Sequence, residues 1–100
     1  MNPTERLSEM FELVADEGSF IRFVEALIAD RQRAVKAEKE NPASPYGPDA
    51  GGWENTSIES FLEGAAAWAT DSGFGSKQSI DNGNVWKRFA AFLYAGKDYE

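Results

Sequence analysis

Carboxylates are the side chains of this sequence whose spacing could support chemistry. Glu59 and Glu63 are four residues apart, which places both on one face of a helix, and Asp71 follows about two turns later. A pair of carboxylates can act in hydrolysis or hold a hard cation such as Mg²⁺ or Ca²⁺. Because the sequence offers no third ligand at a fixed spacing, we interpret the pair as a solvated helix edge. We therefore expect no metal site and no cofactor.

The absence of histidine and cysteine excludes most familiar kinds of active site. Thiol nucleophiles, zinc and iron–sulfur ligation and histidine bases all need one of these two residues. Serine and lysine could form a catalytic dyad, but none of the serines lies in a nucleophile-elbow context. Disulfides are excluded as well, which is compatible with a reducing cytoplasm. The sequence thus favours a binding protein over an enzyme.

Aromatic residues supply the candidates for a binding surface. Trp53 follows two glycines and precedes Glu54, Asn55 and the start of a helix. Trp53 could cover the helix end, as in a hydrophobic staple, or form a partly exposed anchor for a protein partner. Tyr99, which precedes Glu100, leaves the same two alternatives open. The candidate binding residues are therefore Trp53, Glu54, Asn55, Tyr99 and Glu100.

The chain is strongly acidic, with 10 Lys and Arg against 17 Asp and Glu and a net charge of −7. The charge is −4 for residues 1–50 and −3 for residues 51–100, so the negative field is global. Such a field repels phosphate backbones and acidic membrane surfaces, and it attracts basic proteins. We expect no nucleic acid or membrane partner and a basic protein as the partner, although the charge could serve solubility alone. Without a secretory stretch or an apolar run of about 18 residues, we expect a cytoplasmic protein.

Hydrophobic periodicity predicts four helices, at residues 3–16, 20–40, 57–71 and 84–96. Long loops are expected at residues 41–56, which are rich in proline and glycine, and at residues 72–83, which are polar. No segment reads convincingly as a strand. One all-α domain over residues 1–100, in an orthogonal or bundle-like packing, is therefore predicted. The aromatic side chains on the apolar stripes are expected in its core: Phe23, Phe61, Trp68, Trp86 and Phe89.

Local capping residues predict where these helices begin and end. Asn2 is expected to cap the first helix, Gly18 to end it, and Ser19 to cap the second. Thr56 and Glu59 have the spacing of a capping box at the start of the third helix.

Two stretches carry a resemblance to a known pattern. One is Trp53-Glu54-Asn55 before a Leu-Glu helix that ends in Ala67-Trp68, and the other runs from Trp86 through Phe89-Ala90 to Tyr99-Glu100. Together they resemble a family of small, uncharacterised bacterial proteins, and the segment from Phe20 to Asp30 looks like its Phe-rich first helix. The loop at 41–52 is longer than in that pattern. The resemblance covers most of residues 19–100 and implies a small soluble protein, without transferring any site residue.

A small, acidic, non-catalytic protein-binding module is the leading hypothesis for function. An inhibitor of the immunity or antitoxin type, bound to a basic partner, would be one form of it. The first alternative is a small-ligand-binding or hydrolytic protein that uses converging carboxylates, which would need a concave pocket. The second is a structural protein that associates with its own copies as a homo-oligomer.

Overall fold

Four helices make up most of the protein. The computed structural model describes residues 3–41, 51–78, 80 and 83–99. They form α1 (Pro3–Glu12), α2 (Glu17–Glu40), α3 (Ile58–Ser72) and α4 (Val85–Gly96), with a short 3₁₀ turn, η1 (Ser76–Gln78). No strand occurs in these ranges, and the predicted all-α class with four helices is confirmed. The cap predicted at Asn2, residues 42–50 of the predicted loop, and Glu100 lie outside the described residues.

The boundary between α1 and α2 differs from the prediction. α1 ends at Glu12 instead of residue 16, and Asp16 caps α2. Oδ1 of Asp16 accepts the backbone N–H of Ser19 at 2.9 Å, and Oγ of Ser19 accepts the backbone N–H of Asp16 at 3.0 Å. This reciprocal capping box starts α2 earlier than predicted, so Gly18 lies inside the first turn and does not end a helix.

The capping box of α3 is displaced by one residue from the predicted one. Ser57 is the N-cap, and its Oγ accepts the backbone N–H of Ser60 at 3.0 Å. Oγ of Ser60 in turn accepts the backbone N–H of Ser57 at 3.2 Å. Both Thr56 and Ser57 carry a hydroxyl that can cap a helix. In the structure the capping box forms between Ser57 and Ser60 instead of between Thr56 and Glu59.

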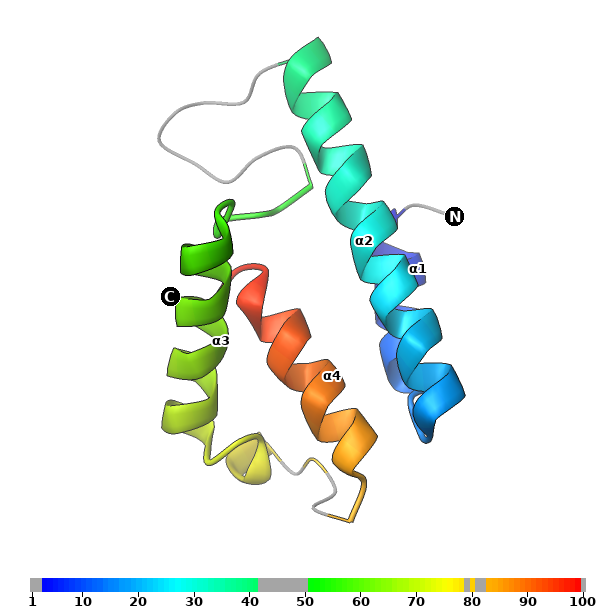
Figure 1. The fold of residues 1–100 in the computed structure, drawn as a ribbon, viewed down its shortest axis with the longest axis vertical. Coiled ribbons are helices and arrows are strands. Elements are labelled where there is room, and N and C mark those ends of the chain that lie inside the picture. Colours follow the sequence, from blue (N-terminus) through cyan, green and yellow to red (C-terminus); the bar gives the residue numbers. More distant parts are fainter. Residues whose placement is uncertain (1–2, 42–50, 79, 81–82, 100) are drawn as a thin grey trace.

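Helix α4 lies between α3 and the pair formed by α1 and α2 (Figure 1). Within the described ranges, α2 and α3 each contact α4 and do not contact each other. The molecule is a thin slab of 42 × 28 × 19 Å. Two sides of α4 are consequently left uncovered by any described helix, one between α1 and α3 and one between α2 and α3. None of the described helices has the length and apolar character that crossing a membrane requires.

The core is built where α1, α2 and α4 meet, and it contains only part of the predicted aromatic set. Phe23 and Trp68 are buried as predicted, and Phe61 is half-buried against the core. Trp86 and Phe89 are instead 38% and 49% exposed, which corrects the prediction that both lie in the core. Trp86 contacts the ring of Phe20 and Phe89 contacts that of Phe74, but no described helix covers their outer sides, so both stay partly exposed.

The turn after α3 has a constrained backbone. Gly73, Phe74 and Gly75 all have positive φ angles, of 63°, 56° and 90°. A Cβ at Gly75 would lie 2.9 Å from the side chain of Ile80, and the φ of 90° would strain any residue that carries a side chain, so glycine is favoured there. The ring of Phe74 contacts Trp68 at a centroid distance of 5.9 Å. The turn therefore holds Trp68 and Ile80 beside α4.

Candidate functional site

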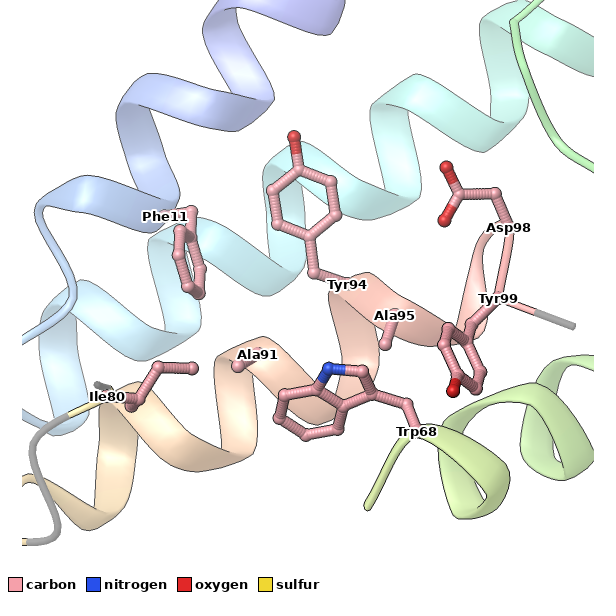
Figure 2. A pocket seen from close by; sticks show the side chains of 8 residues that line it. All are labelled: Phe11, Trp68, Ile80, Ala91, Tyr94, Ala95, Asp98 and Tyr99. Carbon is pink, nitrogen blue, oxygen red and sulfur yellow. The ribbon is translucent and has the colours of Figure 1, made fainter. Parts of the chain in front are cut away.

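A pocket of about 410 Å³ opens on the side of α4 that lies between α1 and α3 (Figure 2). We call it the α1–α3 pocket. Alanines of α4 form part of its floor, aromatic rings surround it, and one carboxylate lies at its edge. Its lining residues are Phe11, Trp68, Ile80, Ala91, Tyr94, Ala95, Asp98 and Tyr99.

Phe11 comes from the end of α1 and joins the pocket to the core. Its ring packs edge-on against Tyr94 at a centroid distance of 5.4 Å. Nζ of Lys87 lies 4.3 Å from the centroid of the Phe11 ring and donates to the Phe11 carbonyl oxygen at 2.6 Å. The chain thus already places a cation on one aromatic ring of the pocket. Trp68, Tyr94 and Tyr99 supply the other rings.

Tyr99 is held at both its hydroxyl and its backbone. Its hydroxyl donates to Oδ2 of Asp71 on α3. Its carbonyl oxygen accepts a hydrogen bond from Nδ2 of Asn55 at 2.9 Å, and the same amide donates to the Gly96 carbonyl at 3.0 Å. The hydrogen bond to Asp71, with a smaller contribution from desolvation, raises the pKa of the Tyr99 hydroxyl above its ordinary value. Asn55 and Asp71 therefore position the Tyr99 ring at the pocket edge.

Two glycines allow the C-terminal turn to lie this close to α3. A Cβ at Gly64 would lie 2.5 Å from Nδ2 of Asn55 and 2.7 Å from the Tyr99 carbonyl oxygen. A Cβ at Gly96 would lie 2.9 Å from the carbonyl oxygen of Phe61. All three distances are shorter than a normal carbon contact, so the position of Tyr99 depends on these glycines.

Trp53 lies in the core, which favours the first of its two interpretations. It is only 4% exposed, and its Nε1 donates to Oδ2 of Asp30 at 2.9 Å. Nζ of Lys97 donates to the same oxygen, also at 2.9 Å. The backbone N–H groups of Glu54 and Asn55 both donate to the Lys97 carbonyl, at 3.1 and 3.2 Å. The segment from Trp53 to Asn55 therefore ties the end of α4 to α2.

The structure brings some of the predicted binding residues together. Asn55 touches the backbone of Tyr99, Trp53 lies beneath the same turn, and Glu54 is exposed beside it. A role of these residues and of Glu100 in binding a partner stays a prediction. The sequence does not mark Trp68, Tyr94 and Asp98 as members of a site. Trp68 and Tyr94 lie on predicted helices whose apolar residues are expected in the core, and Asp98 lies in the short segment after the last predicted helix.

The three carboxylates whose spacing in the sequence could support chemistry do not come together in one site. Glu59 and Glu63 are exposed on α3, and Asp71 pairs with Tyr99. In the part of the chain that the structure describes, no three acidic side chains converge as a metal would require.

Several carboxylates lie near the pocket, of which Asp30 is paired with Lys97. Burial is the main cause that raises the pKa of the Tyr94 hydroxyl, and the nearby carboxylates of Asp30, Asp98 and Glu12 raise this pKa further. A hydrogen bond with Ser8 acts in the opposite direction and lowers it. The Asp98 carboxylate makes no hydrogen bond or ion pair with any described residue. Aromatic faces and carboxylates both attract cations, and their combination disfavours anions. The arrangement can therefore hold a positively charged group.

Comparison with known proteins places the chain in a family whose function is unknown. Residues 16–100 match the model of a family of unknown function, DUF7660. The chain belongs to this family. The match confirms the resemblance to a family of small proteins of unknown function that the sequence patterns indicated. It begins at Asp16, the N-cap of α2, and so includes every lining residue of the α1–α3 pocket except Phe11. No curated protein and no solved structure matches the chain.

Proposed function

We propose that the protein is a non-catalytic binding module whose α1–α3 pocket receives a basic side chain of a partner protein. The observation that carries this proposal is the combination of aromatic rings with the carboxylate of Asp98, which pairs with no described residue, in one pocket. Lysine and arginine offer the matching chemistry, because each joins an apolar stem to a cationic head. An immunity-type or antitoxin-like inhibitor in a bacterial cytoplasm is one form that such a module takes.

The binding free energy expected from this pocket is that of one anchoring side chain within a larger protein–protein contact. A cation within about 6 Å of an aromatic centroid gains about 0.5–1 kcal/mol at an exposed site and about 2 kcal/mol when it is desolvated. A surface ion pair with Asp98 adds at most about 1 kcal/mol. The net charge of −7 would raise the association rate with a basic partner and make it depend on salt.

A small organic cation is the alternative occupant, and it corresponds to the small-ligand hypothesis drawn from the sequence. The pocket volume of about 410 Å³ falls within the range of about 300–1,000 Å³ that small-molecule sites occupy. The same aromatic rings and the same carboxylate would recognise an alkylammonium ion.

Titration of the protein with a short blocked peptide that contains one lysine tests the proposal. The indole N–H signal of Trp68 and the backbone signals of Tyr94 and Asp98 report on the pocket by nuclear magnetic resonance. Asp98→Asn removes the charge with little change of shape, and it should weaken binding about twofold to fivefold. Glu40→Gln, on the exposed C-terminal end of α2, is the matched control for net charge and should leave binding unchanged.

Two further probes decide between the occupants. n-Butylamine carries the lysine head without a peptide, so weaker binding of the amine than of the peptide supports a protein partner. Equal binding of both supports the small cation. The proposal fails if a matched glutamate peptide binds as well as the lysine peptide, or if Glu40→Gln weakens binding as much as Asp98→Asn does.

A further inference from the structure

A second surface lies on the other uncovered side of α4, between α2 and α3. It contains a groove of about 510 Å³ whose walls are largely apolar. Ile28 on α2 and Ile58 and Leu62 on α3 line this groove and are 52%, 77% and 51% exposed. Trp53 and Phe61 also line it, between the two helices. Large aliphatic side chains exposed together around a groove are the pattern of an interaction surface.

The apolar surface continues beyond the groove along α2. Phe20, Val24 and Ile28 are spaced by four residues and therefore share one side of the helix. The Phe20 ring lies 5.4 Å from that of Trp86, which is itself 38% exposed at the start of α4. The surface thus extends from Ile58 on α3 to Trp86 on α4. We call it the α2–α3 face.

The two edges of this face carry opposite charges. On the α2 edge, Arg31 lines the groove with its guanidinium carbon 5.3 Å from the centroid of the Trp53 ring. On the α3 edge, Glu59 and Glu63 are exposed and directly follow Ile58 and Leu62. Arg31, Ile58 and Leu62 line one groove, so the cation and the two carboxylates lie at similar heights along the slab.

We propose that the α2–α3 face binds a second copy of this chain about a two-fold axis that runs along α4. Such a rotation places α2 of each copy over α3 of the other. Ile28 then packs on Ile58 and Leu62 of the second copy, and Arg31 meets its Glu59 and Glu63. A two-fold interface must be complementary to itself, and a face with one positive and one negative edge meets this condition.

The charge pattern favours a second copy over a basic partner helix at this face. A wholly basic helix would bring like charge against Arg31, whereas the second copy presents carboxylates to it. The net charge of −7 on each copy opposes association, but salt screens exposed charges over about 8 Å at physiological ionic strength. The pairing leaves the α1–α3 pocket open, because the pocket lies on the other side of α4. The inference therefore stands or falls independently of the proposed function.

Sedimentation velocity over micromolar to millimolar protein, at physiological salt, tests the pairing. The wild-type chain should shift with concentration from its mass of 11.0 kDa towards twice that value. Ile58→Glu buries a charge only in the paired state and should abolish the shift. Because Ile58 is 77% exposed, this variant should keep its fold, as circular dichroism would verify. Leu13→Glu, at an exposed leucine just after the end of α1, is the matched control and should pair like wild type.

A charge exchange tests the predicted contacts themselves. Arg31→Glu alone, and Glu59→Arg with Glu63→Arg in a second chain, should each weaken self-association because like charges then meet. An equimolar mixture of the two variants should restore association, since every contact in the mixed pair is again between opposite charges. A wild-type chain that stays at 11.0 kDa at all concentrations would overturn the proposal. So would a mixture that associates no better than its components, or a loss of pairing in Leu13→Glu equal to that in Ile58→Glu.

Discussion

Asp30 and Lys97 form an ion pair in which both side chains are buried, with 2.9 Å between Oδ2 and Nζ. The two residues lie 67 positions apart, on α2 and at the end of α4. Trp53 donates to the same carboxylate oxygen, so three distant segments meet at one atom. Charges removed from water are costly unless they are paired and hydrogen-bonded, and this carboxylate has both kinds of partner. The pair therefore fixes how the C-terminal turn, which carries Tyr99, sits on the helices.

Replacing Lys97 with methionine should destabilise the protein strongly. The substitution keeps the volume of the side chain but leaves the Asp30 carboxylate buried with the Trp53 indole as its one partner among the described residues. Loss of one member of a buried ion pair costs about 3–5 kcal/mol of unfolding free energy. Urea denaturation followed by tryptophan fluorescence would measure the change.

The double variant Asp30→Leu, Lys97→Met separates lost pairing from lost packing. Because it leaves no unpaired charge, it should recover part of the stability that Lys97→Met alone loses, less the cost of removing the acceptor of the Trp53 indole N–H. A double variant as unstable as the single one would show that the ion pair is not the cause.

The helices were predictable from sequence because each has an apolar stripe with a helical period. Their ends were less predictable, because neighbouring residues compete as caps. Asp16 and Ser19 form a reciprocal pair that no single residue indicates, and Ser57 prevails over Thr56 in the same way. The exposure of Phe89 was not predictable either, since periodicity shows that a stripe exists and not whether another helix covers it.

The candidate site was predictable only in part. Trp53 and Asn55 were identifiable beside a helix start, and both contact the C-terminal turn, Trp53 through Lys97 and Asn55 through the Gly96 carbonyl. Their partners, Asp30 and Gly96, are distant in sequence, and nothing local marks them as neighbours. The pocket depends on such long-range contacts, so Asp98 became a candidate only once the fold was known.

Gly96→Ala should destabilise the protein, whereas Gly18→Ala should not. An added Cβ at Gly96 would lie 2.9 Å from the Phe61 carbonyl oxygen, and displacing backbone typically costs about 1–3 kcal/mol. At Gly18 the nearest atom would be the tip of Arg22 at 3.6 Å, so alanine fits and should raise stability by up to about 1 kcal/mol. Thermal unfolding of the two variants would measure both effects. Equal stability of both would refute the close approach of α3 and α4.

Ser57→Ala should weaken the start of α3. Oγ of Ser57 accepts the backbone N–H of Ser60, and loss of such a cap costs about 1 kcal/mol. Thr56→Ala is the control that distinguishes the observed cap from the predicted one, and it should have a smaller effect. Chemical denaturation can resolve the difference, and amide hydrogen exchange at Ser60 should accelerate only in Ser57→Ala.

The Tyr99 hydroxyl should ionise at a higher pH than an ordinary tyrosine. Its hydrogen bond to Asp71 stabilises the protonated form, which raises its pKa in the folded protein above the value of about 10 in the unfolded chain. The stabilising contribution is therefore complete below pH of about 10 and is lost as the pH rises through the folded-state pKa. Tyrosinate absorbance, compared with that of Tyr99→Phe, would isolate this titration. Asp71→Asn removes the negative charge and should lower the Tyr99 pKa towards its ordinary value, and an unchanged titration in that variant would contradict the contact.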